Sequence, residues 1–568
     1  IHFHGQHQRG TCPMDGVAGV TQCAIDLQSS LEYQFTAKPA GTFFYHAHNL
    51  PYQMGDGVFG AFIVQEHPGN DPYNSGSTII QGGNDRQHNN NNNKNLGNVA
   101  QEVVVGLSDW MGYDSHTIYQ KVSQWRWDKN NNNNNVWPLT HFIPLINGQQ
   151  NNFTFTMAQG STYRLRIYCA TVEYGYRLFL TGGHRMTIIA ADGALVKPTI
   201  TDYLDIYSGE RYDVLVTADQ NVGTYLLLAN ALAFTGTLQK EIVYATFNYK
   251  GNDDSNLDTA VANQLESFNN ADPTLKLLDR HTLVAYRDEA TGHFSEGYQE
   301  IAGPAKVMAK PWVYKTTSYA VVNETQFTFM NAWDNHFFHH QSFTNPTTPL
   351  LFLGDNKSLK KHVSKETREI LVAAYSNLSD THSATLGPRL QFLELGETID
   401  IVFQNAPTND NNDMGLFNAY HPIHIHGHYF WSLATGLGAF DADVAAETAN
   451  FVDPPLRDTV VVPPRSWVLV RLQANNPGLW LMHCHTETHA VFGMKTILVV
   501  GDAADRLAPP DGLGVCRNVD PIQDSHQRPA SFASAPIIYT IGLIGTGALL
   551  LWILFCCWRE YSQPYHRV

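Results

Sequence analysis

The stretch Leu481–Met494 reads Leu-Met-His-Cys-His-Thr-Glu-Thr-His-Ala-Val-Phe-Gly-Met, and the interpretation of the whole chain follows from it. If its first residues form a strand, His483 and His485 point to one face and Cys484 points to the other. All three side chains are good ligands for transition metals. A thiolate on one face can therefore hold one copper ion while its two neighbours hold different copper ions behind it.

Further donors lie close to Cys484 in the sequence. His489 and Met494 can return to the face of the cysteine where the chain leaves the strand. Two histidines, one cysteine and a weakly bound methionine are the ligands of a blue-copper electron-transfer centre. This stretch supplies only one of those histidines, so the other must come from elsewhere. His421, which opens the run His421–His428, is the candidate.

The chain also contains four His-x-His pairs, each of which places two imidazoles on one strand face. Eight imidazoles from four strands are what a cluster of three copper ions requires. With 26 histidines in 568 residues, one such pair arises readily by chance, but four pairs do not. The pairs are His2/His4, His46/His48, His424/His426 and His483/His485.

These motifs resemble those of the three-domain multicopper oxidases, the family of laccases, ferroxidases and ascorbate oxidases. The resemblance covers about residues 1–505 and implies four copper ions, O₂ as acceptor and a small reducing substrate. Electrons would enter at a type 1 copper, pass along Cys484 to the flanking histidines, and reduce O₂ to water. The implied ligands are His421, Cys484, His489 and axial Met494 for type 1; His2 and His424 for type 2; and His4, His46, His485 with His48, His426, His483 for the type 3 pair.

Two carboxylates match acids that relay protons in this family. Asp15, in Met14-Asp15-Gly16, corresponds to an acid beside the type 2 copper. Glu487 corresponds to an acid beside the type 3 pair. Without the resemblance, Asp15 is equally well a turn residue before glycine, and Glu487 a solvated charge.

The reducing substrate is less well defined. Fungal membrane ferroxidases place iron-binding acids at positions that are occupied here by Phe417, Thr181 and Gly182. Laccases have an acid where Asp192 falls, and it accepts the proton of the phenol; Asp192 before Gly193 also fits a plain turn. We expect an oxidase of phenols or related aromatics similar to animal-type laccases, with a ferroxidase as the alternative. A copper-free binding or adhesion module would lack some of the ligands, and none is missing.

Composition and charge limit the fold and the partners. Charged residues make up 15% and aromatics 12%, with 43 glycines and 27 prolines, which favours an all-β chain with many turns. The net charge of −16 argues against nucleic acid or anionic lipid as a partner. The resemblance implies three cupredoxin-like Greek-key β-sandwiches. We place them at 1–68 (partial first domain), 98–250 (second domain) and 301–505 (third domain), with a polar linker at 251–300.

The ends of the chain carry further expectations. The sequence opens at Ile1 without an initiator Met or signal peptide, so we expect a truncated first domain and an upstream secretion signal. After a stalk at 506–536, Ile537–Trp558 runs 22 residues without a charge, enough to cross a bilayer, although a buried core helix is the alternative. Arg559 opens a short tail, 559–568, which we expect in the cytoplasm. The expected protein is a single-pass type I protein of the plasma membrane or another secretory membrane. The sequence does not identify a permease or other membrane partner.

The cysteines and sequons agree with an oxidising compartment. Apart from Cys484 and two cysteines in the apolar run, four cysteines can form two bridges: Cys12, Cys23, Cys169 and Cys516. The resemblance implies Cys23–Cys516, because the family joins the cysteine of Thr-Gln-Cys to the C-terminal extension. Cys169 resembles the second-domain cysteine of the family, and Cys12 is its partner only by elimination. Glycosylation sequons begin at Asn152, Asn323, Asn356 and Asn377.

Overall fold

The computed structural model describes most of residues 1–506. The chain divides into two compact units, Ile1–Arg517 and Asn518–Val568, and the fold below is that of the first. The expected membrane span 537–558 and Cys516 lie outside the described residues. The undescribed residues are 26–27, 50–51, 67–70, 74–77, 81–98, 133–138, 140–141, 234, 252–256, 270–275, 288–328, 333–334, 339–340, 343–348, 354, 360–384, 387–389, 406–418, 439, 492 and 507–568.

The first domain contributes an antiparallel sheet that carries two of the histidine pairs. Its strands are β1 (His2–His4), β2 (Gly41–His46) and β3 (Phe59–Val64), in the order β1-β2-β3. The register pairs His2 with His46, so these two histidine motifs lie side by side. Phe44 of β2 is fully buried and packs with Tyr168 of the second domain, which ties the two domains together.

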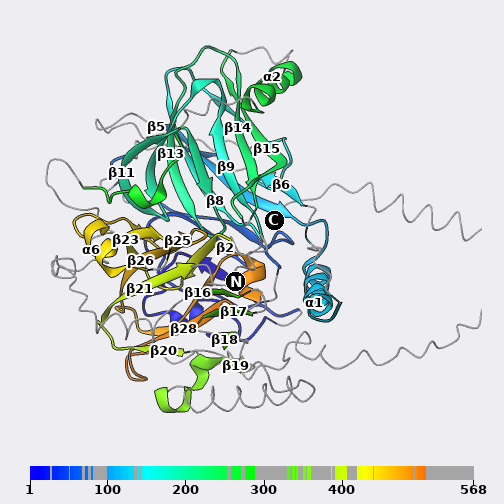
Figure 1. Cartoon of the computed structure of the whole chain (residues 1–568). Coiled ribbons are helices and arrows are strands. Elements are labelled where there is room, and N and C mark those ends of the chain that lie inside the picture. Colours follow the sequence, from blue (N-terminus) through cyan, green and yellow to red (C-terminus); the bar gives the residue numbers. More distant parts are fainter. Residues whose placement is uncertain are drawn as a thin grey trace, which may run out of the picture. The chain divides into compact units, whose positions relative to one another are not determined.

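The second domain is a sandwich of two sheets around one apolar core (Figure 1). One sheet contains β4 (Thr78–Ile80), β5 (Val99–Trp110), β6 (Ile143–Ile146), β8 (Thr162–Cys169), β10 (Met186–Ala191), β11 (Ala194–Thr201) and β13 (Arg211–Thr217), and the other contains β7 (Thr154–Met157), β9 (Gly175–Leu180), β12 (Tyr203–Ile206), β14 (Thr224–Leu232) and β15 (Leu238–Tyr249). Their orders are β11-β10-β13-β8-β5-β4, with β6 beside β5, and β12-β9-β14-β15-β7. Ile167 of β8 and Leu227 of β14 belong to the core between them.

The third domain has three sheets among the described residues. One consists of β16 (Phe329–Ala332), β17 (Asn335–Phe338), β18 (Gln341–Ser342) and β19 (Thr385–Leu386); another of β20 (Leu390–Leu393), β28 (Lys495–Val500), β27 (Gly478–Cys484), β22 (His421–Ile425) and β25 (Thr459–Val462); the last of β21 (Thr398–Asn405), β26 (Ser466–Gln473), β23 (Phe430–Leu437) and β24 (Leu456–Arg457). Apolar side chains of β27 and β28 face those of β21 and β26 in a second core. The prediction of an all-β, cupredoxin-like architecture is confirmed.

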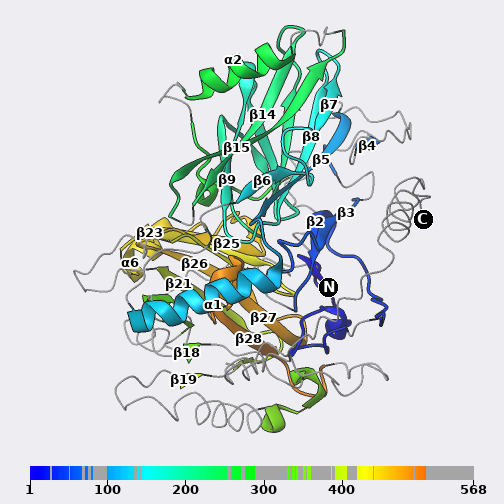
Figure 2. The same ribbon diagram turned by 90° about the vertical axis from the view of Figure 1, so that its right-hand side faces the viewer.

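The described parts of the stretch expected as a linker, 251–300, pack on the second domain. Helix α2 (Leu257–Asn269) packs on β14, where Val261 joins a cluster with Leu226 and Leu228 (Figure 2). Farther along, Ala285 pairs with Val196 of β11. Apolar side chains of α2 thus cover part of the sheet that contains β14, and the helix packs as part of the second domain. Strand β4, which precedes residue 98, also pairs with β5 of this domain.

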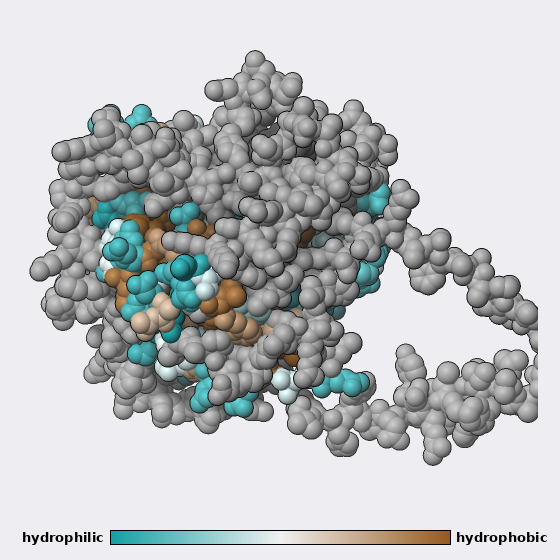
Figure 3. Space-filling model, turned by 90° about the horizontal axis from the view of Figure 1, so that it is seen from below, coloured by the Kyte–Doolittle hydropathy of each residue, from teal (hydrophilic) through white to brown (hydrophobic). Residues whose placement is uncertain are grey.

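Helices are few among the described residues. Helix α1 (Ser115–Asn132) ends within the asparagine run 130–135. None of the described helices is long and apolar enough to cross a bilayer. On the face in Figure 3, apolar side chains of described residues gather with hydrophilic ones around them. Exposed apolar surface is ordinary in proteins, so we assign no function to this face.

The pairing of Cys12 with Cys169 that was considered from the sequence is wrong, because both cysteines are free and buried. Cys12 packs in the third-domain core, where its Sγ lies 3.4 Å from the backbone nitrogen of Leu479. Cys169 lies in the second-domain core. Cys23 is disulfide-bonded, and its partner is outside the described residues, so Cys23–Cys516 remains a prediction.

Candidate metal centre

Strand pairing brings the remaining histidine motifs together. Strand β22 lies between β25 and β27, and its register places His424 opposite His483 and Ile423 opposite Cys484. Because side chains alternate along β27, His483 and Cys484 point to opposite faces. Cys484 ends the strand, and the short helix α7 (Glu487–Val491) carries His489 back towards it. The chain thus places two groups of donors on either side of one strand end.

Eight histidines from the four His-x-His pairs converge in one buried region. Their ring nitrogens form groups whose atoms all lie within 4.8 Å of one another. The His4 Nδ1 lies 3.1 Å from His485 Nε2, and His426 Nε2 lies 3.2 Å from His483 Nε2. The groups are His4, His46 and His485; His48, His426 and His483; and His2, His4 and His424.

Hydrogen bonds behind the rings fix which nitrogen faces the centre. The Nδ1 of His2 lies 2.8 Å from the Asp15 carbonyl oxygen, and the Nδ1 of His424 lies 2.9 Å from that of Asp458. When Nδ1 donates its hydrogen to such an acceptor, the lone pair on Nε2 remains free to bind a metal. Four further rings also form a hydrogen bond through Nδ1. The pairs are His46 with the oxygen of Ala47, His426 with Asp15, His483 with Cys484 and His485 with Ser208.

His4 has the opposite orientation. Its Nε2 lies 3.2 Å from the Thr459 hydroxyl, and its Nδ1 faces His485. When Nε2 carries the hydrogen and donates it to this hydroxyl, Nδ1 is the nitrogen available for a metal. The residue that follows is Gly5, at a φ of +85°, a conformation that favours glycine.

The donor set fits a metal rather than a packed core. Among the described residues, the buried Nε2 atoms of His2, His46 and His424 have no hydrogen-bond partner. Buried polar atoms without partners are rare in proteins because each costs free energy. Burial, followed by the neighbouring histidines, holds the pKa values of His4, His46 and His48 well below the usual value for histidine. These rings are therefore neutral at physiological pH, the form that binds metals.

A second group lies on the other face of β27. The Sγ of Cys484 lies 3.4 Å from His489 Nδ1 and 3.8 Å from His421 Nδ1. Burial lowers the pKa of His489 to about 3 and raises the pKa of the Cys484 thiol to about 12. Met494 is buried in the same core, and backbone hydrogen bonds join it to Cys484 and His489. All members of the predicted blue-copper set are thus neighbours.

The two predicted relay acids lie on different sides of the histidine region. Asp15 is fully buried, and its Oδ2 accepts a hydrogen bond from His426 Nδ1 at 2.9 Å. It is therefore not a solvated turn residue. Glu487 opens α7, is only partly buried, and its Oε2 lies 3.5 Å from the Tyr52 backbone nitrogen. Burial raises the pKa of Glu487, although Lys495 opposes that shift.

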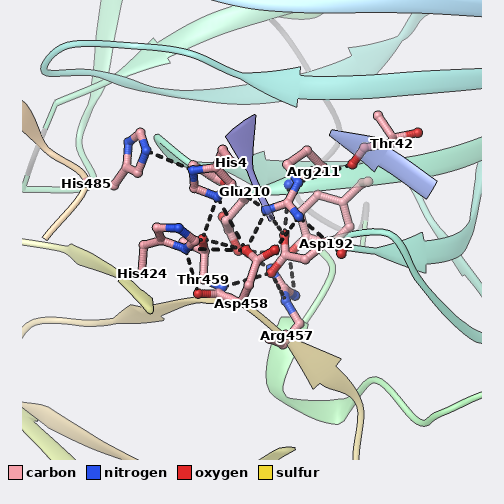
Figure 4. A network of polar contacts seen from close by, with 12 residues as sticks. His4, Thr42, Asp192, Glu210, Arg211, His424, Arg457, Asp458, Thr459 and His485 are labelled. Atoms are coloured by element: carbon pink, nitrogen blue, oxygen red, sulfur yellow. Dashed lines mark hydrogen bonds and ion pairs between the residues drawn. The ribbon is translucent and has the colours of Figure 1, made fainter. Parts of the chain in front are cut away.

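The role expected for Asp192, accepting the proton of a phenol, is wrong. The side chain is 0% exposed, and both carboxylate oxygens are occupied (Figure 4). Oδ1 accepts from the backbone N–H of Arg211 at 3.0 Å, and Oδ2 accepts from Arg457 Nε at 2.7 Å. With a φ of +50° followed by Gly193 at +84°, Asp192 is the turn residue that was the alternative. A substrate cannot reach it.

The same network reveals residues that the sequence analysis missed. Arg211, fully buried, donates to both carboxylate oxygens of Asp458, and Asp458 in turn lies 3.4 Å from His4 Nε2 (Figure 4). A Cβ on Gly5 would lie 2.6 Å from Arg211 Nη2, which explains why glycine follows His4. Ser208 holds His485 from the second domain. No local motif marks these residues, because each contacts a histidine or an ion-pair partner that is remote from it in sequence.

Comparison with known proteins agrees with this geometry. Family profiles described as multicopper oxidase match residues 1–69, 101–252 and 352–504. An L-ascorbate oxidase of Cucurbita maxima is 30% identical over 516 residues, which are 88% of this chain and 80% of that protein. Laccase-6 of Arabidopsis thaliana is 27% identical over 524 residues, 88% of this chain and 82% of that protein.

A solved structure shares the fold. The crystal structure of Fet3p, described as a multicopper oxidase that functions in iron import, superposes with a TM-score of 0.60. The superposition covers 90% of this chain and 82% of that one, at 22% sequence identity. At this identity the likeness extends to the fold alone.

Proposed function

Because the chain belongs to the multicopper oxidase family and is a copper-dependent enzyme that uses O₂, we propose that it oxidises phenols and related small organic reductants, one electron at a time. O₂ takes up four electrons and becomes water. The observation that carries this proposal is the end of β27, where Cys484 faces one donor group while His483 and His485 face the other.

The four donor groups receive copper as follows in this proposal. His421, Cys484 and His489 would hold the type 1 ion, with Met494 as a further ligand. The neutral rings and the buried Nε2 atoms without partners support a cluster at the eight histidines. We assign the type 2 ion to His2 and His424, and the type 3 pair to His4, His46, His485 and to His48, His426, His483.

When bound, copper supplies one-electron redox chemistry and the reduction of O₂. The chain supplies the connection between the two groups. Cys484 is covalently bonded to both His483 and His485, and the carbonyl of Cys484 also accepts a hydrogen bond from His483 Nδ1 at 2.8 Å. These bonds give a short route from the thiolate to the histidine cluster.

Asp15 and Glu487 are proposed to move the four protons that O₂ reduction consumes. Asp15 contacts the rings of His2 and His426, so a proton on its carboxyl group is next to the cluster. Glu487 lies two residues after His485, and burial raises its pKa while the charge of Lys495 opposes that shift.

The proposal of an organic substrate rests on the positions where ferroxidases carry iron-binding acids. Thr181 is buried and donates a hydrogen bond to Gln264, and Gly182 forms a turn at a φ of +74°. Neither offers a carboxylate. Relatives named L-ascorbate oxidase and laccase also point to organic reductants. Because Asp192 is buried, the phenolic proton must leave to solvent or to another base.

Membrane attachment through Ile537–Trp558, with the catalytic domains outside the cell or in the lumen, is part of the proposal. Its support is the run of 22 uncharged residues.

The test uses the full chain loaded with copper. Oxygen uptake is measured with a simple diphenol, with ascorbate and with Fe(II), while the blue absorption is followed. Saturable diphenol or ascorbate oxidation with weak iron oxidation is the expected result. Tight, saturable Fe(II) oxidation would make the chain a ferroxidase. A colourless protein that consumes no O₂ would contradict both oxidase functions and favour a copper-free binding or adhesion module.

A further inference from the structure

A loop of the second domain contacts the helix that carries His489. The loop Val172–Tyr174 follows β8 and is held by one buried carboxylate, that of Asp109 on β5. Asp109 Oδ1 accepts from the backbone N–H of Val172 at 2.6 Å, and Oδ2 accepts from those of Glu173 and Tyr174 at 3.0 Å each. Three charge-assisted hydrogen bonds fix the loop firmly to the sheet.

This loop holds α7 at two points. The backbone N–H of Glu487 donates to the Val172 carbonyl oxygen at 2.9 Å. The hydroxyl of Thr488 donates to Glu173 Oε2 at 2.6 Å, and both residues are buried. Helix α7 has only five residues, so tertiary contacts must hold it, because isolated helices of that length are unstable.

We propose that Glu173 is a positioning residue: through Thr488 it holds α7, and with it His489, against the second domain, and its charge state tunes how readily the site at His489 and Cys484 accepts an electron. The tuning rests on the proposed type 1 assignment, whereas the positioning does not. The helix position is set by a residue more than three hundred positions away in the sequence.

The surroundings of Glu173 make its charge state depend on pH. Burial raises the pKa of Glu173 to about 8; the charges of Asp109 and Glu487 add to this, and the hydrogen bond from Thr488 opposes it. Other groups facing this region are Tyr52, Tyr174, Cys484 and, beside Glu487, Lys495. Glu173 is therefore neutral at pH 7 and anionic at pH 9.

A negative charge next to a copper–thiolate site stabilises the oxidised ion, which carries one more positive charge. We therefore expect the type 1 potential of the wild-type chain to fall between pH 7 and pH 9. Glu173→Gln keeps an oxygen that can accept from Thr488 but cannot ionise. This variant should match the wild type at pH 6 and lose the fall above pH 7.

The potential is measured by anaerobic redox titration of the blue absorption of the copper-loaded full chain from pH 6 to pH 9. Identical pH profiles for the wild type and Glu173→Gln would overturn the tuning role. A chain without blue absorption would contradict the proposed function and this tuning role together, but not the positioning role.

The positioning role is tested by amide hydrogen exchange of Glu487–Val491 in the full chain as purified. Thr488→Val removes the hydroxyl at nearly constant volume and should speed exchange roughly three- to tenfold, as expected for one lost hydrogen bond. Thr488→Ser keeps the hydroxyl and is the matched control. If Thr488→Val exchanges at the rate of Thr488→Ser, Glu173 does not hold the helix.

Discussion

At the scale of single residues, the centre depends on donors that burial keeps in the right protonation state. The imidazole of His485 is neutral because charging it away from water is costly, and the Cys484 thiol holds its proton until a metal displaces it. The hydrogen bonds at Nδ1 then point the lone pairs inwards. Each of these effects belongs to one side chain and its immediate neighbours.

Cys484→Ser should abolish the blue absorption, because the hydroxyl is a far weaker ligand than a thiolate. Oxidation of the organic substrate should fall by at least about a hundredfold, because changing a group that only orients a metal ligand already costs about 10–100-fold and here the ligand itself is lost. Absorption spectra and oxygen uptake are the measurements. Cys169→Ser is the control: it is a free, buried cysteine of the second-domain core, so it should keep the colour and lose only stability.

Asp192→Asn should act on stability rather than on substrate choice. The change breaks a buried ion pair with Arg457 and weakens one with Arg211, which typically costs about 3–5 kcal/mol. Denaturant unfolding measures the cost. Asp202→Asn, whose partner Arg185 is 56% exposed, should cost less than about 1 kcal/mol. A selective loss of phenol oxidation in a fully stable Asp192→Asn protein would restore the catalytic role.

At the scale of elements, turns and strand ends position the donors. Strand β27 ends at Cys484, and α7 begins three residues later, so one strand end serves both groups. The sequence predicted this arrangement from alternation alone. It did not predict α2, because a short amphipathic helix within a polar stretch resembles a linker.

Gly5→Ala should disrupt the end of β1. A Cβ there would lie 2.5 Å from Phe43, 2.6 Å from Arg211 and 2.7 Å from Asp458, and φ is +85°. We expect the free energy of unfolding to fall by several kcal/mol, and the histidine cluster to lose its copper. Denaturant unfolding and copper content are the measurements. Gly10→Ala has a similar φ of +68° but nothing within 4 Å, so it should cost only about 1 kcal/mol. Equal effects of the two changes would show that packing at Gly5 is unimportant.

At the scale of the whole molecule, the histidine cluster and the ion-pair network join all three domains. His4 comes from the first domain, Ser208 and Arg211 from the second, and Asp458 and His485 from the third. The second domain supplies no copper ligand in the proposed assignment. It nevertheless orients two of the rings, through Ser208 and through Arg211 with Asp458.

Removing copper should therefore lower the stability of the whole molecule. A ligand present at a thousand times its dissociation constant stabilises the folded state by about 4 kcal/mol. We expect the chelated protein to unfold at least about 5 °C below the copper-loaded one, measured by scanning calorimetry. Adding Cu(II) back should restore the transition, whereas Mg²⁺ should not. Unchanged unfolding after complete copper removal would mean that the domains hold together without the centre.

Burial of Glu173 should make the stability of the chain fall as pH rises. Its pKa is about 8 in the fold and near 4.5 when unfolded, so the folded state binds more protons between those values. In that window the free energy of unfolding decreases by up to about 1.4 kcal/mol per pH unit, and below it the contribution is constant. Denaturant unfolding from pH 5 to pH 8 should show a smaller decrease for Glu173→Gln than for the wild type.

The sequence by itself determined the family, the all-β architecture and the donor set. That information is local: it lies in pairs of histidines two residues apart and in one cysteine between them, and the period of a strand turns such spacing into geometry. The family resemblance, rather than the strand period, gave Asp15 a place beside the histidine region, and the structure puts it against His426.

Only the tertiary structure decided what each isolated acid, arginine and cysteine does. Asp192 became an ion-pair partner, Cys12 and Cys169 were left unpaired, and Glu173 came into contact with α7, because those outcomes depend on which strands meet across domains. A spacing of two residues constrains neighbouring side chains directly. A contact between residues hundreds of positions apart depends on the packing of the whole chain, which no short motif encodes.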